Sequence, residues 1–303
     1  MDWFFQQLIN GLALGSIYAL IALGYTMVYG ILRFINFAHS DVLMLGAFAA
    51  YFLAPVAARL CSLPSYSGAL LVTVLAAGIC AVAGILIERL AYRPLRDRPK
   101  LTVLITAIGV SLFIEFTCQH KSVFGASTKP FPNLLPQHDF RLAGLAVNSN
   151  DLVVPLVTVV LLAALWFIVQ KTKIGTAMRA VSFNHQAAAL MGVSINRVIS
   201  FTFGLGSALA AIAGVLYAMK APGIEPLMGV QPGLRAFVAA VLGGIGNLPG
   251  AALGGLVLGL LETFAGGMPA ISNYRDGIAF AILILILLFR PAGLLGKAQI
   301  EKV

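Results

Sequence analysis

Long apolar segments recur along almost the whole chain, and they restrict the possible folds more than any other feature of the sequence. An α-helix needs about 20 apolar residues to cross the hydrocarbon core of a bilayer. Of the 303 residues, 60% are hydrophobic and only 10% are charged. A soluble domain needs a more polar surface than this composition supplies. We therefore expect an all-α, polytopic membrane bundle that forms one transmembrane domain, residues 1–303.

The apolar stretches predict about eight transmembrane segments, one of which is interrupted. The uninterrupted spans are expected at residues 8–31, 42–58, 69–90, 101–118, 152–169, 198–219 and 276–289. Residues 235–264 are also apolar but contain Gly243-Gly-Ile-Gly-Asn-Leu-Pro-Gly250, which breaks the helix around Gly246, Pro249 and Gly250. Irregular backbone is tolerated at membrane depth only against protein or a watery cavity. We predict a broken or re-entrant hairpin near a translocation path, with a plain Gly/Pro loop between two short crossings as the alternative.

The distribution of Lys and Arg predicts the orientation. Basic residues gather at positions 89–100 and 171–197, and loops enriched in such residues face the cytoplasm. Residues 119–150 carry more dilute charge and are expected outside. The N-terminus is then outside and the C-terminal tail is cytoplasmic, provided that residues 235–264 cross the membrane twice or not at all. These basic loops account for the net charge of +9, so nucleic-acid binding is not expected.

A second interruption, residues 33–41, separates the first two spans and carries several polar side chains. Asn36, His39 and Asp41 are expected at the inner membrane boundary or dipping into it. Because irregular backbone accompanies transport sites, these three residues and Asn247 form the candidate translocation path. Capping of the following helix explains Asp41 equally well. A single His without a placed partner does not by itself predict proton coupling.

Small and acidic residues inside the apolar segments have further implications. Glycines recur at every fourth position, which lets helix backbones approach closely, so helix contacts are expected at Gly11 and Gly15 and at Gly246, Gly250 and Gly254. Glu115 and Glu262 are costly in lipid unless they are paired or hydrated. Either residue could line a pathway, reach the interface, or pair with an Arg of another helix.

The loop at residues 171–197 contains an alanine-rich run, Gln186-Ala-Ala-Ala-Leu-Met-Gly192. It predicts a short helix that ends at Gly192, because glycine permits the left-handed turn that closes a helix. The run resembles the coupling loop of ATP-binding-cassette importer permeases, whose pattern is Glu-Ala-Ala, three residues, then Gly, with Gln186 in place of the Glu. The resemblance implies that the residues coupled to an ATPase are Arg179, Gln186, Ala187, Ala188 and Gly192.

Four separated stretches extend the resemblance over nearly the whole chain: residues 14–30, 35–41, 239–250 and 290–296. In this order they are similar to the LivH-type permease of bacterial branched-chain amino acid importers. The resemblance implies an inner-membrane protein that works with a homologous second permease, two cytoplasmic ATP-binding subunits and a periplasmic amino-acid-binding protein. It also implies leucine, isoleucine and valine as cargo, although relatives carry other amino acids, amides or urea.

No catalytic chemistry is expected of this chain. It lacks the G-x-x-x-x-G-K-[ST] sequence, so ATP should be used by the partner subunits, and no cofactor is expected here. The three cysteines show no CxxC or Cys/His spacing, so no metal site is expected. Two other classes remain as alternatives. An ion-gradient-driven transporter would need a relay of paired ionisable groups, whereas Glu115, His39 and Glu262 are scattered. An intramembrane enzyme would need a catalytic motif such as HExxH in the spans, and none occurs.

Overall fold

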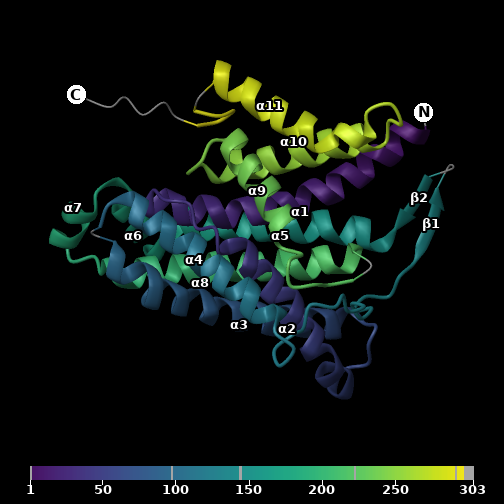
Figure 1. Ribbon diagram of the computed structural model, residues 1–303, viewed down its shortest axis with the longest axis horizontal. Helices are drawn as coiled ribbons and strands as arrows, with labels where there is room; N and C mark the ends of the chain where they lie inside the picture. The colour runs from purple at the N-terminus through teal and green to yellow at the C-terminus, as the bar shows by residue number, and fades with distance from the viewer. Residues whose placement is uncertain (1, 97, 143–144, 222, 291, 297–303) are drawn as a thin grey trace.

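The protein is an almost entirely helical bundle (Figure 1). The computed structural model describes residues 2–296 except 97, 143–144, 222 and 291. Within these residues, eight helical segments are long and apolar enough to cross a bilayer: Asp2–Leu32 (α1), His39–Leu60 (α2), Tyr66–Leu95 (which contains α3), Lys100–Gln119 (α4), Ser149–Lys171 (α5), Ile195–Lys220 (α8), Leu248–Gly266 (α10) and Ser272–Phe289 (which contains α11). The prediction of an all-α, polytopic bundle is confirmed.

The remaining elements extend two of these segments or lie between them. The third segment consists of α3 (Tyr66–Ile87), η1 (Glu88–Tyr92) and η2 (Arg93–Leu95), and the last consists of η3 (Ser272–Tyr274) and α11 (Arg275–Phe289). Three shorter helices are α6 (Lys173–Phe183), α7 (His185–Leu190) and α9 (Val230–Gly243). An antiparallel hairpin, which the sequence did not predict, pairs β1 (Asp139–Leu142) with β2 (Leu145–Asn148), so that Asp139 lies opposite Asn148.

The bundle has two distinct ends. α6 and α7 lie at one end, and the β1–β2 hairpin and the start of α1 lie at the other (Figure 1). We name these the α7 end and the hairpin end. α1 runs from the hairpin end toward the α7 end, while α11 lies along one edge of the bundle beside α10 (Figure 1).

Two helices form the centre of the bundle. In the apolar middle of α1 and α8, 89% and 78% of the residues are buried, compared with 17% in α4 and in α5. The outer helices expose many large apolar side chains, such as Leu112, Phe113 and Phe116 of α4. An exposed apolar surface of this extent is costly in water but suits contact with lipid tails. The burial pattern therefore agrees with a multi-pass membrane protein.

Glycines allow α1 to lie directly on α10. A Cβ atom added to Gly15 would come 2.8 Å from the Leu256 Cα, and one added to Gly259 would come 2.2 Å from the Gly15 Cα. Gly11 faces Leu260 in the same way, with 2.9 Å between the added Cβ and Leu260 Cδ2. Lipid tails supply no hydrophobic drive for helix association, so close backbone packing across small residues replaces it.

Two glycine-to-alanine substitutions are expected to change stability in opposite directions. A Cβ at Gly254 would lie 2.1 Å from the Ala239 oxygen, so Gly254→Ala must separate α9 from α10, and overpacking of this kind costs about 1–3 kcal/mol. A Cβ at Gly78 meets nothing within 4 Å, and alanine favours a helix over glycine by about 1 kcal/mol. Thermal unfolding in detergent compares Gly254→Ala with its control Gly78→Ala. An unfolding midpoint of Gly254→Ala at or above that of the wild type would contradict the α9–α10 contact.

α2 begins inside the bundle rather than at its end. α1 continues to Leu32, yet the His39 ring at the start of α2 lies on Gly24, where an added Cβ would be 2.3 Å from His39 Nε2. The distance along the helix from Gly24 to the end of α1 is about 12 Å. The segment between the two helices therefore returns into the bundle, and Arg33 begins the return with a positive φ of 55°. Of the two positions expected for residues 33–41, the one that dips into the bundle is observed.

α9 also begins inside the bundle, next to the start of α2. A Cβ added to Gly229, which precedes α9, would lie 2.1 Å from the Ser40 oxygen. α8 ends at Lys220, where its ammonium group contacts Asp151 at the hairpin end. The chain therefore re-enters the bundle from the hairpin end before α9 starts. The N-terminal ends of two helices meet in the interior as a result.

The break in the predicted hairpin is a tight turn at the α7 end. Gly244 and Gly246 adopt φ values of 103° and 95°, which favour glycine. Asn247 then caps α10, since its Oδ1 accepts a hydrogen bond from Gly250 N (3.3 Å), and Pro249 lies in the first turn. α9 and α10 together carry the chain to the α7 end and back. The irregular backbone inside the bundle is thus the approach to α9, while the Gly- and Pro-rich turn is at the end of the bundle.

Candidate functional site

Residues 171–197 form a helical projection at the α7 end (Figure 1). α7 starts after Asn184, whose Oδ1 accepts a hydrogen bond from Ala187 N (3.0 Å). It closes at Gly192, which has a φ of 79°, and Val193 N donates to the Ala188 oxygen (3.0 Å). Asparagine at the N-cap and a left-handed glycine after the C-terminus explain why so short a helix forms here.

The projection presents large apolar side chains to its surroundings. Phe183, Leu190 and Met191 are 89%, 88% and 84% exposed. We define the α7 surface as these three residues together with two exposed neighbours, Gln186 and Ala187. Apolar residues that cluster outside the membrane-spanning segments are typical of a protein interaction site.

Ala188 and Gly192, two of the predicted coupling residues, contribute to α7 in different ways. Ala188 is only 5% exposed, so it packs against the rest of the protein and positions the helix. Gly192 is exposed, and a Cβ added there would meet nothing within 4 Å. The sequence analysis did not single out Phe183, Leu190 and Met191. Within α7, the spacing of residues 187, 190 and 191 on one helical face is the signal that could have found Leu190 and Met191, whereas Phe183 ends α6.

α6 joins α7 to the membrane-spanning helices. An added Cβ on Gly175 would lie 2.2 Å from the Ile168 oxygen of α5, so α6 packs tightly on the end of α5. Arg179, another predicted coupling residue, strengthens this corner because its Nη1 donates to the Val169 oxygen. Thr172 caps α6 by accepting a hydrogen bond from Gly175 N (3.1 Å). A displacement of α6 must therefore move the end of α5 as well.

The first residue of α7 meets two other loops. Partial burial and the nearby charges of Arg96 and Arg33 lower the pKa of His185 from its ordinary value of 6.5. Arg33 follows α1 and Arg96 follows α3. Three separate connections thus come together at the α7 end, next to the exposed surface.

A cavity of about 140 Å³ lies where α2 and α9 begin, and α1 and α4 complete its walls. We name it the central cavity. Ser40, Ser111 and Glu115 form its polar side. The Ser111 hydroxyl donates to Asp41 Oδ2 (2.5 Å), and Asp41, which is 1% exposed, interacts electrostatically with Glu115. The start of α2 and the second half of α4 therefore bring together two carboxylates from separate parts of the sequence.

The four candidate path residues occupy different places. Asp41 lies directly behind the wall of the central cavity, through Ser111. Asn36 accepts a hydrogen bond from the Tyr92 hydroxyl (2.6 Å), and the His39 ring packs beside Tyr25 with 4.7 Å between the ring centroids. Asn247 is at the α7 end, where its Nδ2 donates to the Leu295 oxygen (2.7 Å). The structure thus separates Asn247 from the other three.

Arg235 binds three helices together toward the hairpin end. Its Nη1 lies 2.7 Å from Glu262 Oε1 of α10 and donates to the Tyr18 hydroxyl of α1 (3.0 Å), while Nη2 contacts Asp276 Oδ1 of α11 (2.7 Å). The Tyr18 hydroxyl in turn donates to Glu262 Oε2 (2.8 Å). Of the possibilities left open for Glu262, pairing with an Arg of another helix is the one observed.

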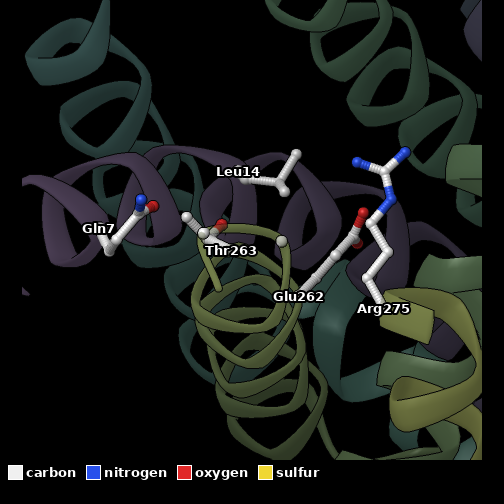
Figure 2. Close-up of a pocket in the computed structure, with 7 residues that line it drawn as sticks. Gln7, Leu14, Glu262, Thr263 and Arg275 are labelled. Carbon is white, nitrogen blue, oxygen red and sulfur yellow. The ribbon is translucent and has the colours of Figure 1, made fainter. Parts of the chain in front are cut away.

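A second cavity, of about 280 Å³, lies beside this network, and Gln7, Leu14, Thr263 and Arg275 contribute to its lining (Figure 2). Glu262 reaches its edge. The cavity lies between α1 and the start of α11. Glu262 already pairs with Arg235, so the lining residues that the structure describes include no unpaired carboxylate. Among the described residues, no group of three or more His, Cys, Asp or Glu side chains is arranged to hold a metal ion.

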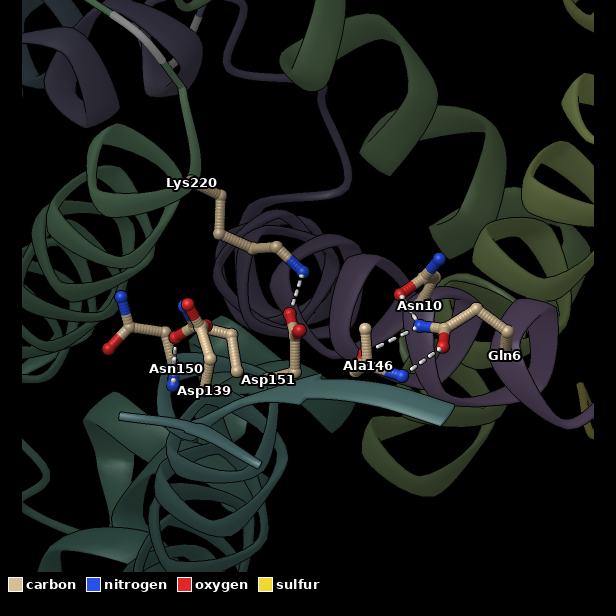
Figure 3. A network of polar contacts seen from close by, with 8 residues as sticks. Gln6, Asn10, Asp139, Ala146, Asn150, Asp151 and Lys220 are labelled. Atoms are coloured by element: carbon tan, nitrogen blue, oxygen red, sulfur yellow. Dashed lines mark hydrogen bonds and ion pairs between the residues drawn. The ribbon is translucent and has the colours of Figure 1, made fainter. Parts of the chain in front are cut away.

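The hairpin is fixed to α1 by a side-chain amide (Figure 3). Gln6 donates from Nε2 to the Ala146 oxygen (3.0 Å) and accepts from Ala146 N (3.0 Å), which imitates the pairing of a neighbouring strand. Lys220 contacts Asp151 (2.6 Å) beside it. Polar contacts therefore attach the hairpin to the start of α1.

Comparisons with known proteins agree with this architecture. The model of the family described as branched-chain amino acid transport system / permease component matches residues 7–287. The chain is 42% identical to the high-affinity branched-chain amino acid transport system permease protein BraD of Pseudomonas aeruginosa, over 99% of this chain and 98% of BraD. It is 40% identical to the corresponding permease protein LivH of Escherichia coli K12, again over 99% of this chain and 98% of the relative.

Among solved structures, PsaBC from Streptococcus pneumoniae in complex with Fab covers 96% of this chain with 93% of its own. Its identity is 13% and its TM-score is 0.48, a likeness too distant to support an argument about the fold. The family model and the two permease relatives extend over nearly the whole chain. The resemblance drawn from the sequence motifs is therefore confirmed, and the chain belongs to the family of branched-chain amino acid transport system permease components.

Proposed function

We propose that this protein is the transmembrane permease subunit of an ATP-driven importer for leucine, isoleucine and valine. The full-length similarity to BraD and LivH supports the substrate class, because both are named as branched-chain amino acid permeases. Other amino acids, amides or urea remain the alternative cargo within the same family. The chain binds no nucleotide in this scheme, and ATP is used by partner subunits.

The exposed α7 surface is the observation that carries this proposal. It offers Leu190 and Met191 to a partner at one end of the bundle, outside the membrane-spanning segments. Helix-in-groove recognition uses apolar side chains presented in this way. α6 is packed on the end of α5, so a partner that grips α7 can pull on the transmembrane helices. We infer that two cytoplasmic ATP-binding subunits supply this pull, one for this chain and one for a homologous second permease.

The proposed orientation follows from the charge at the two ends. Basic residues flank the α7 end, including Arg33, Arg89, Arg93, Arg96 and Lys171. Positively charged loops favour the cytoplasmic side of a bacterial inner membrane, which places the start of α1 and the hairpin outside. The C-terminal segment, which packs on the α9–α10 turn, is then cytoplasmic. The hairpin end is then available to a periplasmic amino-acid-binding protein.

Reconstituted vesicles test the proposal. Leucine uptake is measured with the permease pair, the binding protein and the ATP-binding subunits, and again without the ATP-binding subunits. We expect uptake only when the ATP-binding subunits and ATP are both present. Uptake driven by a proton or sodium gradient alone, with the ATP-binding subunits absent, would instead identify a secondary transporter.

A further inference from the structure

The central cavity has an unusual charge for a site inside a membrane bundle. Several carboxylates of the bundle pair with a basic side chain: Glu88 with Arg96, Asp151 with Lys220, and both Glu262 and Asp276 with Arg235. Within the part of the chain that the structure describes, neither Asp41 nor Glu115 forms an ion pair with a basic side chain. Ionisable groups at membrane depth are costly without a partner. A positively charged ligand would supply one.

The rest of the lining is mostly apolar. It includes Phe37, the ring of Tyr25, and Val230, Leu234 and Phe237 of α9. The volume of about 140 Å³ is smaller than the roughly 300–1,000 Å³ typical of pockets for drug-sized ligands. A cavity with an acidic side, an apolar side and this volume suits a small molecule that carries a cation next to a hydrocarbon group.

We propose that the central cavity is an intramembrane binding site for an apolar amino acid, in which Glu115 meets the ammonium group and α9 contacts the aliphatic side chain. This inference rests on the proposed function, which supplies an amino acid as cargo. Ser111 holds Asp41 through its hydroxyl group, and Glu115, which interacts with Asp41, faces the cavity.

The start of α9 supplies the remaining partner of a zwitterion. Gly229 supplies no side-chain cap, while Val230 N donates to the Leu227 oxygen (3.1 Å) and Gly233 N donates to the Gly229 oxygen (2.9 Å). Val230 and Gly233 line the cavity, so the positive end of the α9 dipole faces it. The N-terminal end of a helix attracts negative charge. The carboxylate of the amino acid is therefore oriented toward α9, and its ammonium toward α4.

The first experiment compares Glu115→Gln with a matched control, Glu225→Gln, in the complete reconstituted complex. Glu225 is exposed in the connection before α9 and does not line the cavity. We expect leucine uptake by Glu115→Gln to fall about tenfold or more, since a buried charge contact is lost, while the control stays close to wild type. Wild-type uptake by Glu115→Gln, in a complex whose own wild type depends on ATP, would overturn the cavity proposal and leave the proposed function intact.

A labelling experiment gives a readout other than transport. Leu234→Cys is introduced with Cys61, Cys80 and Cys118 replaced, and the detergent-solubilised complex is treated with 2-aminoethyl or 2-sulfonatoethyl methanethiosulfonate. Each reagent's rate is divided by its rate with a free thiol in solution. The normalised rate of the cationic reagent is expected to be about tenfold higher than that of the anionic reagent, because the carboxylates attract the cation. Glu115→Gln should abolish this preference, and Glu225→Gln should retain it.

The labelling result also separates the two proposals. If no ATP-dependent uptake is found but the charge preference depends on Glu115, the proposed function fails and the cation-attracting cavity remains. Equal normalised rates for the two reagents, or a preference that survives Glu115→Gln, would show that Glu115 does not attract cations into the cavity. That outcome would overturn the proposed site.

Discussion

Replacing Arg235 by methionine is expected to destabilise the folded protein by about 3–5 kcal/mol, because the substitution leaves a buried carboxylate unpaired. Arg235 is 16% exposed and its partner Glu262 is 5% exposed, so little water can replace the lost contact. The same guanidinium group also contacts Tyr18 and Asp276, and the substitution therefore weakens the attachment of α9 to three helices. Thermal unfolding in detergent, followed by size-exclusion chromatography, measures the effect.

A double substitution tests the electrostatic reason for this loss. Arg235→Met combined with Glu262→Gln removes both charges and keeps an acceptor for the Tyr18 hydroxyl, so most of the stability should return. Lys220→Met is the matched control: its ion pair with Asp151 is more exposed, and such pairs contribute about 1 kcal/mol or less. If Arg235→Met were no more harmful than Lys220→Met, the network would not hold the hairpin end together.

Leu190→Asp is expected to abolish coupled transport while leaving the membrane bundle folded. Leu190 is 88% exposed, so the substitution disturbs no internal packing, but it places a charge in the middle of the α7 surface. Burying an unpaired charge in an interface costs several kcal/mol, which corresponds to a loss of uptake of about a hundredfold or more. Gly192→Asp should act in the same direction, with an added backbone cost because Gly192 has a φ of 79°.

The measurement for Leu190→Asp is leucine uptake together with ATP hydrolysis by the assembled complex. Val123→Asp places the same charge on an exposed apolar residue in the loop after α4, and we expect this control to transport normally. Normal uptake by Leu190→Asp, with both ATP-binding subunits bound, would remove α7 as the coupling helix. Unfolding of the variant in detergent would contradict the assignment of Leu190 as exposed.

The long spans could be predicted because their cause is local. Bilayer thickness sets the length of an apolar run, and each uninterrupted run that was expected corresponds to a helix in the structure. The glycine contacts of α1 with α10 are similarly local in their signal, since every fourth residue faces the same side. Element boundaries were less exact: α1 begins at Asp2, although the first span was expected from residue 8.

The interior of the bundle could not be predicted in the same way, because it depends on contacts between distant residues. Asp41 and Glu115 are on different helices, and no periodicity relates them. In the sequence, Glu115 is far from the other ionisable residues of the spans and has no expected partner. In the structure, α2 begins inside the bundle and places Asp41 beside Ser111, which is on the same helix as Glu115. The Gly/Pro-rich turn after α9 was the more conspicuous signal, but it lies at the end of the bundle.

The α7 surface shows what a motif can and cannot specify. The pattern from Gln186 to Gly192 correctly predicted a short helix that ends at a left-handed glycine. It did not indicate that Ala188 would face inward, while Leu190 and Met191 would be almost fully exposed. That distribution depends on how α7 sits against α6 and α8, which is information that the motif does not contain. The coupling role of these residues remains a prediction.

Cysteine cross-linking tests the central claim most directly. Met191→Cys is placed on the α7 surface in a protein whose three native cysteines are replaced, and Val123→Cys serves as the control at the other end. In inner-membrane vesicles, we predict that a bifunctional thiol reagent joins Met191→Cys to an ATP-binding subunit, with a yield that changes when ATP is bound, and that Val123→Cys forms no such product. Labelling of Met191→Cys from the periplasmic side, or the absence of any cross-link to an ATP-binding subunit, would contradict the account.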